Sequence, residues 1–191
     1  MTFLFSFFQL FFAYFIGSLP TGSFIAYLKG IKNIRAHGSG NIGATNVARV
    51  LGIHYFFLVF FIDCFKAYAA LWGIYYWGAS CSWLLVCALA VLLGNSRSIF
   101  LRLKGGKGIA TSFGLVLFLF PSILLIVVPV WLLVLALIRN VGMASVASMV
   151  VLPFAGIVLG ADIHAIWFLV IVALWCIFLH RVNIKLFVTK T

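Results

Sequence analysis

The sequence predicts an all-α integral membrane protein with about seven transmembrane helices. Hydrophobic residues make up 66% of the chain, charged residues make up 8%, and the mean hydropathy is +1.28. A soluble domain of 191 residues could not cover this much apolar surface, because soluble monomers rarely expose large apolar patches. The apolar residues also fall into runs of helical length between short polar breaks, as expected for a multi-pass helical protein.

Seven apolar stretches give the predicted helices, and together they make residues 1–191 a single multi-pass membrane domain. In chain order the stretches are approximately 3–28, 53–77, 81–93, 109–120, 122–138, 143–160 and 163–180. Because about 20 residues are needed to cross a bilayer, 81–93 and 109–120 are short. Each is expected to be a half-length helix or to continue into the polar loop between them. Pro20, Pro129 and Pro153 fall inside predicted spans, where a proline kinks a helix or leaves a carbonyl unbonded.

The positive charges predict how these helices are oriented. If the spans alternate sides, every one of the 13 lysines and arginines except Lys66 falls in loops on one side of the membrane. The opposite loops contain Asp162 and no cation. The positive-inside bias therefore places the N-terminus outside, the C-terminus in the cytoplasm, and the polar loops 29–52 and 94–108 on the cytoplasmic face. Since the first cation is Lys29, the first stretch is expected to be a retained span and not a cleaved signal peptide.

The most distinctive polar segment runs from His37 to Asn46 and is followed by Arg49. Three of its residues, Gly38, Gly40 and Gly43, are glycines, which allow positive φ angles and let consecutive N–H groups surround one point. Hydroxyl and amide side chains lie between them, and arginine can contact phosphate with two parallel hydrogen bonds. An ordinary turn between two helices is the simpler interpretation. We favour an anion-binding loop because a second loop of the same kind follows.

That second loop is Lys104-Gly105-Gly106-Lys107-Gly108, which leads directly into a predicted helix. The first N–H groups of a helix and its positive dipole end bind phosphate readily, and Lys107 adds a point charge. The loop is not a Walker A motif, because Gly108 stands where serine or threonine is required. No strand is predicted before either loop, so nucleotide-binding folds of that kind are not supported.

Other residues limit the chemistry that the chain can perform. The only carboxylates are Asp63 and Asp162, too few for a carboxylate metal cluster or a glycosidase-type acid pair. The four cysteines lack the spacing of a zinc site or a redox pair. Lys66 follows Asp63 by three residues within a span, which predicts a buried ion pair that positions the polar loops. A direct catalytic role for Asp63 is the alternative. None of the four histidines has an aspartate five residues later, so the acyltransferase dyad of that spacing is absent.

Three segments resemble the signature motifs of the bacterial acyl-phosphate:glycerol-3-phosphate acyltransferase family. They are Gly17–Gly22, Gly38–Arg49 and Lys104–Thr111; Asp63-x-x-Lys66 and His180-Arg181-x-Asn183-Ile184 match further family positions. The resemblance covers nearly the whole chain in order. The chain departs from the family pattern at Asn95, where the family usually has histidine, at Val182, where a carboxylate is common, and at the C-terminus, where an acidic residue is usual.

The resemblance implies an enzyme of the bacterial cytoplasmic (inner) membrane whose active site faces the cytoplasm. Its reaction would transfer an acyl group from acyl phosphate to the 1-hydroxyl of glycerol 3-phosphate and form lysophosphatidic acid for phospholipid synthesis. It would use no cofactor or metal, would bind no nucleic acid, and would have a functional link to a soluble enzyme that produces acyl phosphate. The residues that match the family's active site are Ser39, Arg49, Lys107, Ser145, His180 and Asn183. The expected phosphate-binding residues are Gly38, Gly40, Asn41, Gly43, Thr45, Asn46, Lys104, Gly105, Gly106 and Gly108.

Two functions of other classes fit part of the sequence. A small transporter for a phosphorylated solute could use the polar loops as a gate, but it should show repeated halves that meet at the bilayer midplane. In this chain the only sign of a repeat is a weak similarity between Asn41–Thr45 and Gly108–Thr111. A lipid-binding scaffold would explain the basic face but not the two glycine loops.

The predicted topology can be tested with reporter fusions. Because the cations segregate so completely, a reporter fused after Thr191 should be cytoplasmic and one inserted at Ser80 should be external. Paired cytoplasmic and external reporters at each site would measure this. A cytoplasmic signal from the Ser80 insertion would contradict the seven-span arrangement.

Overall fold

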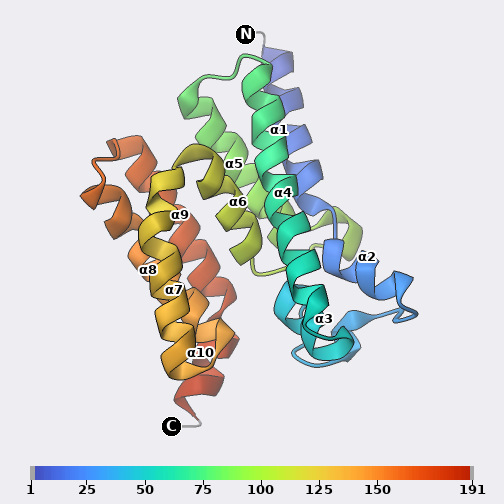
Figure 1. The fold of residues 1–191 in the computed structure, drawn as a ribbon. Coiled ribbons are helices and arrows are strands. Elements are labelled where there is room, and N and C mark those ends of the chain that lie inside the picture. Colours follow the sequence, from blue (N-terminus) through green and yellow to red (C-terminus); the bar gives the residue numbers. More distant parts are fainter. Residues whose placement is uncertain (1–2, 190–191) are drawn as a thin grey trace. The chain divides into compact units, whose positions relative to one another are not determined.

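In the computed structural model, the described residues 3–189 form helices joined by loops and turns, with no strand among them (Figure 1). This confirms the predicted all-α fold. The chain divides into two compact units, one ending at Phe118 and the other beginning at Leu119. The prediction of one membrane domain across both units stays a prediction. Lys190, one of the cations counted for topology, lies outside the described residues, as does Thr191.

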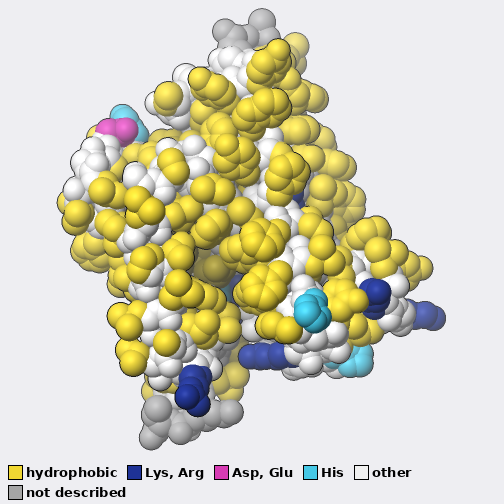
Figure 2. Space-filling view, viewed as in Figure 1, with side chains coloured by type: hydrophobic (Ala, Val, Ile, Leu, Met, Phe, Trp, Pro, Cys, Tyr) yellow, Lys and Arg dark blue, Asp and Glu magenta, His cyan; other side chains and the backbone are white. Residues whose placement is uncertain are grey.

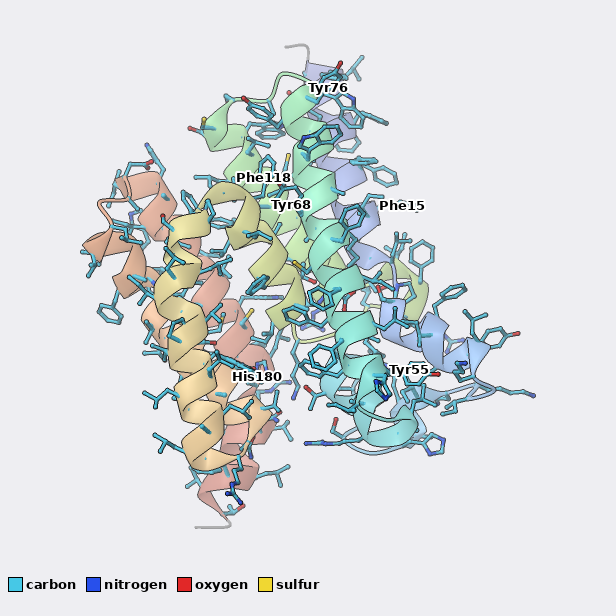
Figure 3. All side chains as sticks on the ribbon, in the orientation of Figure 1. Phe15, Tyr55, Tyr68, Tyr76, Phe118 and His180 are labelled. Atoms are coloured by element: carbon cyan, nitrogen blue, oxygen red, sulfur yellow. The ribbon has the colours of Figure 1, made fainter. Side chains whose placement is uncertain are left out.

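The first unit holds six α-helices and two short 3₁₀ turns in its described part. Its elements are α1 (Phe3–Ser18), α2 (Thr21–Leu28), η1 (Ile34–Ala36), α3 (Ala44–Leu51), α4 (His54–Tyr76), α5 (Cys81–Ser96), η2 (Ile99–Leu101) and α6 (Ile109–Leu119). Helices α1 and α5 pack along each other, and α4 packs against both. Helix α6 lies on α4, where the Tyr68 and Phe118 rings meet edge to face at 5.2 Å (Figure 3).

The described part of the second unit consists of helices in which consecutive members pack against each other. Its elements are η3 (Pro121–Ile123), α7 (Leu124–Ile138), α8 (Val141–Val158), α9 (Ile163–Leu179) and α10 (Arg181–Val188). Helix α8 packs against both α7 and α9. Asp162 caps α9, accepting hydrogen bonds from the amides of His164 and Ala165, and the bond from Ala165 contributes most to lowering the pKa of that carboxyl. Within this unit the Asp162 carboxylate lies where α8 connects to α9 and is magenta in Figure 2. A lysine or arginine, dark blue in the same view, lies at the opposite end of the unit, near α10.

The helices account for all seven predicted apolar stretches. Four are long and apolar enough to cross a bilayer, two bent pairs (α1 with α2, α9 with α10) qualify together, and α6 is a shorter apolar helix. These observations and the largely apolar surface of each unit agree with an integral membrane protein (Figure 2). How many of the helices cross the bilayer, and in which direction, stays a prediction.

Two helices were not predicted. Short α3 falls in the polar loop 29–52, and α10 follows the last predicted span, with a 56° bend between α9 and α10. Pro20 separates α1 from α2 at a bend of 40°, the kind of interruption that was expected of a proline inside a span. Of the two short stretches, α5 continues to Ser96 and α6 stays short. Pro129 and Pro153 lie inside α7 and α8.

Small residues let α1 and α5 approach closely. Gly17 on α1 lies against the backbone of Val91, and Gly94 on α5 lies against the backbone of Tyr14, so a Cβ at either glycine would collide with main chain. Such small-residue contacts are typical of helix packing in membranes. At the far end of the same pair, the Trp83 indole donates to the Gln9 amide oxygen at 2.9 Å.

This packing predicts opposite effects for the same substitution at two glycines. Gly17→Ala should destabilise the protein by about 1–3 kcal/mol, because main chain cannot move aside as a side chain can. Gly73→Ala in α4, where an added Cβ meets nothing within 4 Å, should be neutral or stabilising by about 0.4–1 kcal/mol. Thermal unfolding of both variants in one detergent would measure the difference. Equal melting temperatures would contradict the close α1–α5 approach.

Candidate functional site

The first glycine loop is organised around the buried side chain of Asn46, at the start of α3. Its amide oxygen accepts hydrogen bonds from the backbone N–H of Ser39 at 2.6 Å and from the Ser39 hydroxyl at 3.1 Å. Its amide nitrogen donates to the carbonyls of Asn41 at 2.7 Å and His37 at 3.1 Å. Both ends of the amide are thus used within the loop, which suits Asn46 to holding Ser39 in place.

Backbone conformation explains two of the glycines in this loop. Gly38 and Gly40 have φ angles of +60° and +70°, which residues with a Cβ rarely adopt. A Cβ at Gly38 would also collide with the Asn46 amide oxygen. Gly43 caps α3, and its N–H donates to the Asn41 side chain at 3.1 Å. Thr45 and Arg49 follow on α3, and Arg49 is exposed in its last turn.

The second glycine loop is hydrogen-bonded to the end of α5. The N–H of Gly105 donates to the Ser96 carbonyl at 2.9 Å, and the N–H of Gly106 donates to the Asn95 carbonyl at 2.8 Å. Gly105 lies so close to these carbonyls that any Cβ would collide with the Asn95 oxygen. Gly108 has a φ of +83° and leads into α6. The loop therefore presents Lys107 at a helix N-terminus, as predicted.

The structure brings the two loops together within the first unit. The Arg35 guanidinium, from η1 just before the first loop, donates a hydrogen bond to the Lys104 carbonyl of the second. Burial lowers the pKa of the half-buried Lys107 ammonium, and the nearby positive charge of Arg49 lowers it further. Two cations, one from each loop, thus lie close enough to repel each other. An anion between them would relieve that repulsion.

A buried ion pair lies beneath these loops, as predicted from the sequence. Lys66 Nζ lies 2.6 Å from the Asp63 carboxylate and donates to the Leu19 carbonyl at 2.8 Å. The Thr21 hydroxyl also donates to Asp63 at 2.7 Å. Removing one partner of a buried pair typically costs about 3–5 kcal/mol. The pair therefore ties α4 to the break between α1 and α2.

The second unit holds the other three predicted site residues. The Ser145 hydroxyl, one turn into α8, donates to the Val141 carbonyl at 2.8 Å and accepts from the Trp131 indole at 3.3 Å. Asn183 of α10 lies against Gly142, where an added Cβ would come within 3.2 Å of its Cγ. Since α8 and α9 are joined by a short loop, the start of α8 and the end of α9 share one end of this unit.

His180 is buried at the corner between α9 and α10 (Figure 3). Its Nδ1 lies 2.8 Å from the Cys176 carbonyl, which can only accept a hydrogen bond. Nδ1 therefore carries a proton, and in the neutral ring Nε2 holds the lone pair. This tautomer allows Nε2 to accept a proton.

Three residues of these networks were missed as site candidates. Arg35 was counted only for topology, Asn95 only as a departure from a motif, and Trp131 was not singled out. Arg35 precedes the first loop by two residues, so its position was a usable signal. The contacts of Asn95 and Trp131 join distant parts of the chain, and nothing in their local sequence indicates them.

Taken together, the described elements define a helical membrane protein whose first unit holds two glycine loops joined by the Arg35–Lys104 hydrogen bond. The sequence model of the family described as glycerol-3-phosphate acyltransferase matches residues 7–190, and the chain belongs to this family. The glycerol-3-phosphate acyltransferase of Thermosipho melanesiensis is 41% identical over 93% of this chain and 86% of its own. That of Aquifex aeolicus is 38% identical over 95% of each chain.

Solved structures agree with this assignment. The crystal structure of PlsY (YgiH), an integral membrane glycerol 3-phosphate acyltransferase, in its glycerol 3-phosphate form has a TM-score of 0.91 and 36% identity over 97% of this chain and 92% of that one. Its lysophosphatidic acid form has a TM-score of 0.88, 35% identity and the same coverage. The resemblance noted in the sequence is therefore confirmed at the level of the family.

The lowered pKa of Lys107 predicts how anion binding depends on pH. Its proton leaves below the ordinary lysine pKa of 10.5, so its positive charge is lost at a lower pH than that of an ordinary lysine. The folded chain also binds fewer protons than the unfolded chain in this interval, so the free energy of unfolding rises with pH there. Affinity for inorganic phosphate, measured by calorimetry from pH 7 to 10, should fall by about tenfold or more as one charge-assisted hydrogen bond is lost.

Lys107→Arg keeps its charge at high pH and should remove most of this alkaline fall. Lys32→Arg, at an exposed lysine in the loop before η1, serves as the matched control and should leave the profile unchanged. An identical profile in wild type and Lys107→Arg would remove Lys107 from the phosphate site.

Proposed function

We propose that the chain transfers an acyl group from acyl phosphate to the 1-hydroxyl of glycerol 3-phosphate, forming lysophosphatidic acid and inorganic phosphate. Membership of the glycerol-3-phosphate acyltransferase family supports the acceptor and the reaction class. The observation that carries the choice of donor is that the Arg35–Lys104 hydrogen bond joins the two glycine loops, which lead to Arg49 on one side and contain Lys107 on the other. Two phosphate-bearing substrates suit such a site better than one.

The chemistry requires little more than positioning. The glycerol oxygen attacks the acyl carbon, a C–O bond forms, the bond from the acyl carbon to the phosphate oxygen breaks, and phosphate leaves with that electron pair. Acyl phosphate is a mixed anhydride, so its phosphate leaves without a strong general acid. Holding the two reactants in register can supply about 7–11 kcal/mol of the barrier. Such a reaction needs no carboxylate as acid or base, so a chain with only two carboxylates can perform it.

In this proposal the two glycine loops bind the phosphates and the second unit assists the transfer. Arg49, Lys107 and the first N–H groups of α3 and α6 offset the negative charges, while Ser39 donates a hydrogen bond to phosphate or to the developing oxyanion. Ser145 and Asn183 serve the same reaction as hydrogen-bond donors. The proton of the attacking hydroxyl goes either to a substrate phosphate oxygen or to His180, whose Nδ1–H···O bond leaves Nε2 as the basic nitrogen.

We also place this activity in a bacterial cytoplasmic membrane, with the active site facing the cytoplasm. The concentration of cations in loops that the positive-inside bias assigns to the cytoplasm supports this orientation. Because acyl phosphate is reactive, a soluble enzyme that produces it on the same side is the expected supplier.

The proposal predicts direct transfer with a strong preference for the donor that carries phosphate. Purified protein given acyl phosphate and glycerol 3-phosphate should release phosphate and form lysophosphatidic acid, and acyl-CoA should be a poor donor. Arg49→Ala and Lys107→Ala should each lower kcat/KM about 10- to 100-fold, the value of one charge-assisted hydrogen bond. Arg97→Ala, at an exposed arginine outside both glycine loops, is the matched control.

Labelled acyl phosphate alone distinguishes direct transfer from a covalent intermediate. We expect no acyl label on the denatured protein, because no acid is available to support a serine or cysteine nucleophile. Stoichiometric label on Ser39, Ser145 or a cysteine, released by glycerol 3-phosphate, would disprove direct transfer. Equal rates with acyl-CoA and acyl phosphate would disprove the proposed donor.

A further inference from the structure

Asn95 joins the second glycine loop to the buried ion pair. This residue is 7% exposed and lies one position before the end of α5. Its side-chain oxygen accepts a hydrogen bond from Lys66 Nζ at 3.3 Å, while its carbonyl accepts one from the N–H of Gly106 at 2.8 Å. One residue thus contacts the buried ammonium with its side chain and the loop with its backbone.

The ammonium of Lys66 has all of its donors in use. It carries three N–H groups, and three acceptors surround it: the Asp63 carboxylate, the Leu19 carbonyl and the Asn95 amide oxygen. Lys66 therefore has no remaining hydrogen bond to give a substrate. Its influence on the site must pass through the groups that it holds, and among these Asn95 is the one bonded to the loop.

The second glycine loop packs closely on Asn95. An added Cβ at Gly105 would collide with the Asn95 carbonyl, and one at Gly106 would lie 3.3 Å from the Asn95 amide nitrogen. A rotation or displacement of Asn95 would therefore move the backbone that leads directly into Lys107. That position matters because Lys107 is held close to the like charge of Arg49.

We propose that Asn95 is a positioning residue that couples the buried Lys66–Asp63 pair to the second glycine loop and so fixes where Lys107 meets phosphate. The inference rests on the proposed function only in taking Lys107 as a phosphate ligand. A misplacement of about 1 Å in such a group can cost about 100-fold in rate.

The decisive variants replace the Asn95 amide with apolar groups. Asn95→Leu removes the acceptor for Lys66 while keeping a branched side chain, and Asn95→Ala does so without steric demand if the larger leucine folds poorly. Both variants should lower kcat/KM by about 10- to 100-fold. They should lower the affinity for glycerol 3-phosphate, measured by calorimetry, by the same factor. Asn95→Asp keeps an acceptor for Lys66 and should recover most of the loss.

A double-mutant comparison separates positioning from simple destabilisation. In a Lys107→Ala background the Asn95→Leu penalty should shrink to less than about threefold, because Asn95 then has no ammonium left to position and coupled residues are not additive. Gln9→Met removes another buried amide, the acceptor for Trp83 at the other end of α5. It should lower the melting temperature while leaving KM and kcat unchanged.

Wild-type affinity with Asn95→Leu, or an undiminished penalty in the Lys107→Ala background, would overturn the inference. Equal losses for Asn95→Asp and Asn95→Leu would also overturn it, because the acceptor would then not matter. If the wild type binds glycerol 3-phosphate but does not use acyl phosphate, the proposed donor fails while the calorimetric comparison still decides the role of Asn95.

Discussion

The hydrogen bonds of the Lys66 ammonium hold the helices of the first unit together, because they join α4 to the α1–α2 break and to α5. An ammonium within a membrane-spanning helix is tolerated only when its donors are satisfied inside the protein. Asp63 provides one acceptor from the same helix, and the other two come from α1–α2 and α5. The Leu19 carbonyl can reach Lys66 because Leu19 and Pro20 lie between α1 and α2, outside both helices. The helix break thus supplies a hydrogen-bond acceptor for the buried charge.

The two glycine loops keep their shape without a carboxylate. The Asn46 amide holds the first loop, and the carbonyls at the end of α5 hold the second. Neither needs a carboxylate to hold its shape, and the only carboxylate described in the first unit, Asp63, is committed to Lys66. In the proposed function, Arg49 and Lys107 bind the phosphates of the substrates.

Residues close in sequence were predictable, and contacts between distant segments were not. The seven apolar stretches follow from hydropathy, and the pairing of Asp63 with Lys66 follows from helical spacing. Helices α3 and α10 were missed because each is eight residues of mixed polarity, whose stability comes from packing and not from an apolar run. The bond from Lys66 to Asn95 spans 29 residues and depends on how α4 and α5 pack, which no local pattern reveals.

In the proposed reaction, the hydroxyls of Ser39 and Ser145 would exchange internal hydrogen bonds for hydrogen bonds to a charged substrate. Ser39 donates to the Asn46 amide and Ser145 donates to the Val141 carbonyl, so each hydroxyl already has a neutral acceptor. A neutral hydrogen bond contributes about 0.5–1.5 kcal/mol, whereas one to a charged group contributes about 1.5–3 kcal/mol. Under the proposed function, rotating either hydroxyl from its internal acceptor to a phosphate or an oxyanion would therefore gain free energy. Water is neutral and would offer no such gain, so the exchange would favour the charged groups of substrate and transition state.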